Sequence, residues 1–322
     1  MVTNIFIDGT PSDADEVNQN FSDVENISVS VAELGVRTLQ SNNVFTNGPN
    51  IIVDEFTDAN GTKNTVNTGS STAVYASSPD RYSLNGTLGT VESATISSSG
   101  SASQNISFDV VCNNTGIFNE IKVDISNSGT RTITCNIIKS GDIVASQSYG
   151  PTVSLGVHTF TFSLQDYLEL FTNGDTATIT IDDSTAATLD RVTGYSYDGT
   201  NIDIISQNVP GGVVPCSFAE AAFNSSSTVI VDTNTTTLDG NELGFAISAP
   251  DADIPANTSI TATISDGTNS LSAVTIDPIK KGVVISNDGT LSSGTLKCTF
   301  TLNTTDTSVT PTLPSYGVNI LR

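Results

Sequence analysis

The stretch that decides the fold is EIKVDIS, residues 120–126. Its apolar side chains Ile121, Val123 and Ile125 alternate with charged ones. Successive side chains of a β-strand point to opposite faces, so this pattern predicts a strand with one buried face and one face toward water. The same alternation recurs in three nearby stretches: NISFDVV (105–111), RTITCNII (131–138) and VHTFTFSL (157–164).

The surrounding composition suits a β protein. Of the 322 residues only 14% are charged and 37% are hydrophobic, and Ser, Thr, Asn and Gly fill much of the remainder, as in sheets joined by tight turns. A cluster of proline and glycine, SQNVPGGVVP (206–215), interrupts the strand pattern. We therefore predict a mainly β chain in three parts: an N-terminal segment (1–49) and two antiparallel β-sandwich domains (50–210 and 211–322), with jelly-roll or immunoglobulin-like topology.

The N-terminal segment carries a helical pattern instead. Ser12 suits an N-cap, and Asp15 stands three residues later, as in a capping box. An apolar stripe with helical spacing follows; it consists of Val17, Phe21, Val24, Ile27, Val31 and Leu34. Val17, Val24 and Val31 are seven residues apart, which is typical of a coiled-coil seam. The stripe predicts an oligomerisation and anchoring element, but its spacing fits equally a helix that folds back on its own sandwich.

The charge excludes several classes of partner. The formal net charge is −23, which argues against binding to nucleic acid or to an anionic membrane. The opening MVTNIFIDGT lacks the basic and apolar regions of a signal peptide, and no apolar run is long enough for a membrane span. We expect a protein that is neither exported nor inserted into a membrane.

The residues needed for common chemistry are sparse. His158 is the only histidine and lies within an alternating strand, and the four cysteines form no C-x-x-C pair, so we expect no catalytic triad, metal or cofactor. Trp is absent, which counts against the aromatic cleft of a glycosidase. We expect no enzyme. Disulfides could pair Cys112 with Cys135 and Cys216 with Cys298, but buried free thiols are favoured.

Two pairs of tyrosines are candidate receptor contacts. Tyr75 and Tyr82 flank a polar loop, and Tyr195 and Tyr197 are one strand step apart, before the turn DGTN. Exposed tyrosine beside Asp and Asn suits a hydroxyl-rich ligand such as a glycan. Packing in the core or at its rim is the competing interpretation for each of them.

The stretch GTPSDADEVNQNF, Gly9 to Phe21, resembles the N-terminal segment of fibre and other structural proteins of tailed viruses. Glu16, Val17, Asn18 and Asn20 match that pattern, as does Phe21. The resemblance implies attachment to the virion through residues 1–49 and β domains that contact the host surface. It also implies assembly in the host cytoplasm, which needs no signal peptide. The chain lacks the glycine-rich or collagen-like repeats of long fibres, so the resemblance points to a short fibre, a spike or a capsid-associated protein.

Three functions compete at this point. The first is a virion structural protein, a homo-oligomer and most simply a trimer, that recognises a host surface glycan or protein or decorates the particle. The second is a cell-surface adhesin, which requires an export signal. The third is a secreted protein that binds or degrades carbohydrate, for which a carboxylate pair in an aromatic cleft is expected.

Overall fold

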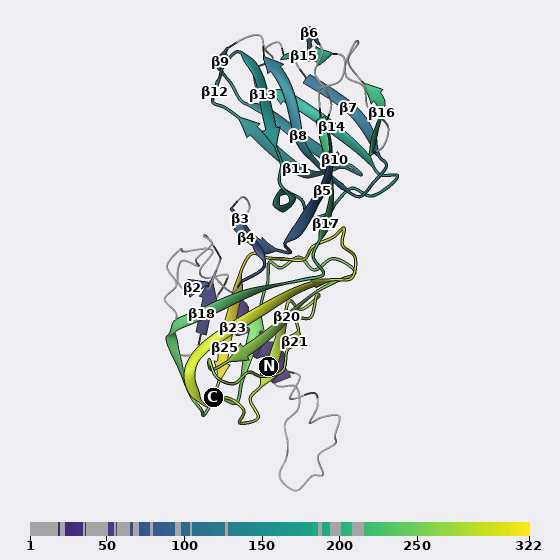
Figure 1. Ribbon diagram of the computed structural model, residues 1–322. Coiled ribbons are helices and arrows are strands. Elements are labelled where there is room, and N and C mark those ends of the chain that lie inside the picture. Colours follow the sequence, from purple (N-terminus) through teal and green to yellow (C-terminus); the bar gives the residue numbers. More distant parts are fainter. Residues whose placement is uncertain are drawn as a thin grey trace. The chain divides into compact units, whose positions relative to one another are not determined.

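The computed structural model of the chain is mainly β, with several antiparallel sheets (Figure 1). The residues that it describes are 19, 23–34, 36, 51–54, 56, 65–66, 71–77, 80–93, 98–103, 105–125, 128–185, 189–193, 201–207 and 216–322. Within those residues there is one α-helix, spanning residues 23–34 with Val36 also helical, and one 3-10 turn. The mainly β fold class is therefore confirmed.

The chain divides into two compact units, and each is formed by segments that are distant in sequence. Unit 1 consists of Met1–Asn85, Ser225–Asp306 and Thr310–Arg322, and unit 2 of Gly86–Asn224 and Thr307–Val309. The strands of unit 1 are β1 (Ile51–Asp54), β2 (Thr65–Val66), β3 (Val74–Ser77), β4 (Asp80–Ser83), β18 (Ser226–Asp239), β19 (Gly244–Ser248), β20 (Thr258–Ser265), β21 (Val274–Thr275), β22 (Gly282–Ser286), β23 (Ser293–Thr304), β24 (Thr312–Leu313) and β25 (Tyr316–Leu321).

Unit 1 contains two larger sheets and a small one. Their strand orders are β1-β25-β19-β22, β2-β18-β23-β20-β21 and β24-β4-β3. Aromatic rings join the two larger sheets, because Phe300 of β23 lies 5.1 Å from Tyr316 of β25 between ring centroids. Every residue of β19 is buried, so the four-stranded sheet is covered on both faces at this central strand. One face packs on the aromatic core, and the α-helix lies on the other.

Unit 2 is built from two main sheets and a two-stranded ribbon. Its elements are β5 (Gly86–Ser93), β6 (Ser98–Ser103), β7 (Asn105–Cys112), β8 (Gly116–Ile125), β9 (Gly129–Thr130), β10 (Ile133–Lys139), β11 (Asp142–Tyr149), β12 (Thr152–Val153), β13 (Gly156–Thr161), the 3-10 turn η1 (Leu164–Asp166), β14 (Thr176–Asp183), β15 (Leu189–Thr193), β16 (Ile202–Gln207) and β17 (Cys216–Phe223). The sheets are ordered β11-β10-β14-β7-β16 and β5-β17-β8-β15-β6, with β13 also paired to β8.

The alternation in the deciding stretch is confirmed. In β8, Ile121, Val123 and Ile125 are fully or almost fully buried, while the charged residues between them are half-exposed. A tight turn follows β10: Ser140 and Gly141 both have positive φ, 54° and 96°. Such a pair of left-handed residues matches the twist of a tight hairpin.

The division into units differs from the three consecutive segments that we predicted. The proposed boundary at residue 210 lies outside the described residues. On either side of it, β16 pairs with β7 and β17 with β8, both within unit 2. The strand β1, by contrast, pairs with β25, near the other end of the chain. Turn residues mark where a strand stops, but they carry no information about which distant strand becomes its partner.

Candidate functional site

The α-helix packs on the sheet of unit 1 through residues that do not belong to the predicted stripe. Ser28, Ala32 and Val36 are buried and lie on one face, four residues apart. Beneath them the sheet presents glycine: a Cβ built on Gly317 would lie 2.6 Å from the carbonyl oxygen of Ala32, and one on Gly282 would overlap a side-chain methyl of Val29. The helix can approach the sheet closely because the sheet has glycine at these two positions.

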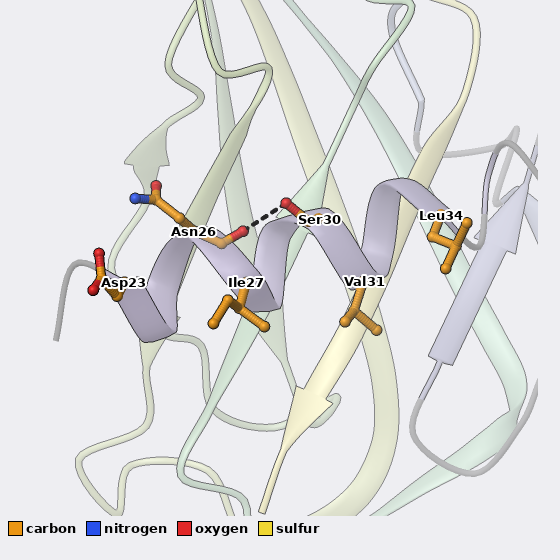
Figure 2. Close-up of a pocket in the computed structure, with 6 residues that line it drawn as sticks. All are labelled: Asp23, Asn26, Ile27, Ser30, Val31 and Leu34. Carbon is orange, nitrogen blue, oxygen red and sulfur yellow. Dashed lines mark hydrogen bonds between the residues drawn. The ribbon is translucent and has the colours of Figure 1, made fainter. Parts of the chain in front are cut away.

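The opposite side of the helix exposes most of the described part of the predicted stripe. Val24 is 49% exposed, Ile27 is 42% and Leu34 is 65%, whereas Val31 is half-buried. Figure 2 shows Ile27 and Val31 pointing to the same side of the helix. These two side chains line a shallow pocket of about 330 Å³. Around them are polar groups; the Ser30 hydroxyl donates a hydrogen bond of 2.8 Å to the carbonyl oxygen of Asn26. We call Val24, Ile27, Val31 and Leu34 the outer face.

The structure thus addresses the alternative left open by the spacing. The helix packs on the four-stranded sheet of unit 1, but through residues that the sequence analysis missed, and the outer face stays accessible. The other two stripe residues, Val17 and Phe21, lie outside the described residues. The signal that could have identified the inner face is the recurrence of Ser28, Ala32 and Val36 at intervals of four, opposite two isolated strand glycines.

The second candidate site contains the predicted tyrosines Tyr75 and Tyr82. They face each other across the β3–β4 hairpin, with ring centroids 5.5 Å apart. Tyr82 is 2% exposed and stacks edge-on against Phe56 at 5.0 Å, so packing in the core accounts for Tyr82. Tyr75 is half-exposed, and its hydroxyl donates to a carboxylate oxygen of Asp80 at 2.5 Å.

An open pocket of about 500 Å³ adjoins these rings. We call it the tyrosine pocket; its described lining residues are Ser71, Thr72, Ala73, Val74, Tyr75, Tyr82 and Asn85. Hydrogen bonds to β18 hold one wall, because the Thr72 hydroxyl accepts the N–H of Thr228 at 2.9 Å and Ser71 accepts that of Ile230 at 3.1 Å. The other tyrosine pair, Tyr195 and Tyr197, lies outside the described residues.

Unit 2 has a smaller polar pocket that the sequence did not indicate. It has a volume of about 310 Å³, and Glu220 lines it together with Asn114 and Thr115. The Asn114 side-chain amide donates to the Glu220 carboxylate at 2.7 Å. The pairing of β17 with β5 shifts register between Ala219 and Ala221, and such irregularities redirect the side chain at the shift, here Glu220.

The cysteines are buried and free, as the sequence analysis favoured. Burial raises the pKa of the Cys112 and Cys135 thiols, and it raises that of Cys298 to about 12. The nucleophilic and metal-binding form of cysteine is the thiolate, which burial suppresses at neutral pH. No group of three His, Cys, Asp or Glu side chains within the described residues is arranged to hold a metal ion.

His158 has an ordinary structural role. Its ring lies 4.4 Å from that of Tyr149, and Nε2 is 2.8 Å from the carbonyl oxygen of Ser154.

Among the described residues, no helix is both long enough and apolar enough to cross a membrane.

No protein-family model matches the chain, and no curated protein matches it. Function therefore has to be argued from the outer face, the tyrosine pocket and the sequence.

Proposed function

We propose that this chain is a structural protein of a virus particle, a short fibre or spike, with no catalytic role. Residues 1–49 attach it to other virion proteins, and the outer face of the helix joins it to further copies, most simply as a trimer. Two β-sandwich domains of jelly-roll or immunoglobulin-like topology then recognise the host surface or decorate the particle. The protein reaches the virion by assembly in the host cytoplasm.

The observation that carries this proposal is that the two faces of the helix have different surroundings. Large apolar side chains on one face of a surface helix normally face a core, yet Val24, Ile27 and Leu34 face outward while Ser28, Ala32 and Val36 are buried. Contiguous exposed apolar surface of this kind typically marks a protein interface. The seven-residue spacing of Val17, Val24 and Val31 suits a bundle of identical helices.

Because the inner face is bound to its own sandwich, a helix bundle would carry the β units with it. A chain of this kind needs no separate linker between its oligomerisation element and its recognition units. This arrangement is what a compact spike requires, and it agrees with the virion segment that Gly9 to Phe21 resembles.

The oligomer is tested by measuring mass. The full chain should have three times the mass of one chain by multi-angle light scattering, and Ile27→Ser/Leu34→Ser should reduce it to that of one chain. The matched control is Leu155→Ser/Val157→Ser in unit 2, where the side chains are 62% and 54% exposed; it should leave the mass unchanged. A wild-type monomer, or equal masses for both double variants, would overturn the oligomer.

Attachment is tested separately. Antibodies against the purified protein should label virus particles, in immunogold microscopy, in cultures that produce it. Deletion of residues 1–18, which keeps the helix that covers the sheet of unit 1, should abolish the labelling while the β units stay soluble. Labelling of cell envelopes instead of particles would favour the adhesin.

A further inference from the structure

We propose that the tyrosine pocket of unit 1 is a subsite for one neutral pyranose unit of a saccharide. This subsite rests on the host-recognition part of the proposed function, and it specifies the class of ligand that is recognised. The geometry belongs to unit 1 alone and does not depend on the oligomer.

Packed neighbours hold the Tyr75 ring in place at the pocket. Tyr75 is the outermost member of an aromatic series that runs through Tyr82 and Phe56 to Tyr316; successive ring centroids lie 5.5, 5.0 and 5.5 Å apart. The last three rings are buried, while Tyr75 is half-exposed. A ring supported by packed neighbours loses little freedom when a ligand binds, which lowers the cost of association.

The Tyr75 hydroxyl has a fixed polarity. It donates its hydrogen to Asp80, so toward a ligand its oxygen can only accept. A sugar hydroxyl can donate to that oxygen and accept from another group at the same time. The exposed hydroxyl of Thr72 is held at the same pocket by Thr228, so polar contacts and an aromatic surface converge.

The charge of the chain favours a neutral ligand. None of the described residues that line the pocket is charged, and the whole chain carries −23. A sialylated or sulfated ligand would find no cationic partner there and would be repelled at long range. The volume of about 500 Å³ falls in the usual range for small ligands, roughly 300–1,000 Å³.

The test uses the full-length protein and four probes: the methyl pyranosides of glucose, galactose and N-acetylglucosamine, with N-acetylneuraminic acid as the anionic probe. Saturation-transfer NMR and titration should detect at least one neutral probe, with Kd on the order of 1 mM, as for a weak single-site contact. Tyr75→Ala should weaken that binding at least tenfold, and Tyr75→Phe should weaken it less because the ring remains.

Tyr149→Ala is the matched control, since Tyr149 is a 40% exposed tyrosine of unit 2; it should leave binding unchanged. The proposal is overturned if no neutral probe binds at 10 mM, if N-acetylneuraminic acid binds as tightly, or if Tyr75→Phe and Tyr75→Ala both bind like the wild type. A trimer that binds no probe would remove this subsite and leave the oligomer standing. A monomer that binds a neutral probe would rule out the oligomer and leave this subsite standing.

Discussion

The two units satisfy their buried surfaces in different ways. In unit 1 the helix covers one face of the four-stranded sheet and packs directly on Gly317 and Gly282. The contact therefore depends on close approach of the two backbones at these glycines. Unit 2 buries an ion pair instead, with Arg131 Nη1 3.1 Å from Asp183 Oδ2 and side chains that are 3% and 0% exposed. The helix contact in unit 1 depends on positions without a side chain, and unit 2 depends on a buried pair of opposite charges.

The largest expected effect breaks the ion pair of unit 2. Arg131→Met leaves the Asp183 carboxylate buried without its cation, and this should lower the free energy of unfolding by about 3–5 kcal/mol. Urea unfolding measures the loss, and hydrogen exchange should place it in unit 2. The matched control is Lys122→Met, because Lys122 pairs with Glu120 at 3.1 Å but both side chains are about one-third exposed; its cost should be at most about 1 kcal/mol. Equal losses would contradict a special role for burial.

The next largest effect is expected when Gly317 of unit 1, which lies under the helix, is replaced. Gly317→Val places a side chain against the backbone of Ala32 and should cost about 1–3 kcal/mol by overpacking. Hydrogen exchange and limited proteolysis should show the helix released while unit 2 is unchanged. Gly129→Val is the control, since a Cβ there meets nothing within 4 Å. A helix that stays protected in Gly317→Val would show that the close approach is not required.

Acid should destabilise both units, but through carboxylates whose pKa is lowered by different groups. Burial alone would raise the pKa of Asp175, but hydrogen bonds from Lys139 and Thr172 outweigh it and lower the pKa. In unit 1, backbone N–H groups of Ser292, Asn269 and Thr268 lower the pKa of Asp266. A depressed carboxyl pKa stabilises the fold above the unfolded value, about 3.9, and that stability is lost as pH falls through the folded value.

Both units should therefore lose stability below about pH 4, but Lys139→Met should reduce the pH dependence in unit 2 only. The measurement is urea unfolding between pH 2 and pH 5, followed through amide NMR signals of each unit. A reduced slope in unit 1 would show that the titration is not local.

The smallest effect concerns the thiols. Native protein should react negligibly with a thiol reagent within minutes, because all four cysteines are buried and burial suppresses the thiolate. Arg131→Met should expose Cys112, Cys135 and Cys216 of unit 2 before Cys298 of unit 1. Mass spectrometry of the labelled peptides identifies the order, and prior labelling of Cys298 would contradict independent loosening of unit 2.

Much of the local structure was predictable. Alternation at Ile121, Val123 and Ile125 identified a strand and its buried face, and the helical spacing identified the one described helix. The partner of β1 was not predictable, because β25 lies near the other end of the chain and antiparallel pairing leaves no mark in either strand alone. Of the tyrosines, Tyr75 is accessible and Tyr82 is core, a difference that depends on what packs behind each ring.

The sequence by itself determined the strand periodicity, the acidic charge, the scarcity of catalytic residues and the presence of an amphipathic helix, since these follow from residue types and their spacing. Only the tertiary structure decided which face of that helix is buried. The apolar stripe predicts burial by hydrophobicity, yet the sheet beneath is lined by glycine, and a close backbone contact accepts Ser28 and Ala32 where a leucine would not fit. The larger side chains were thereby left facing outward, available to a partner.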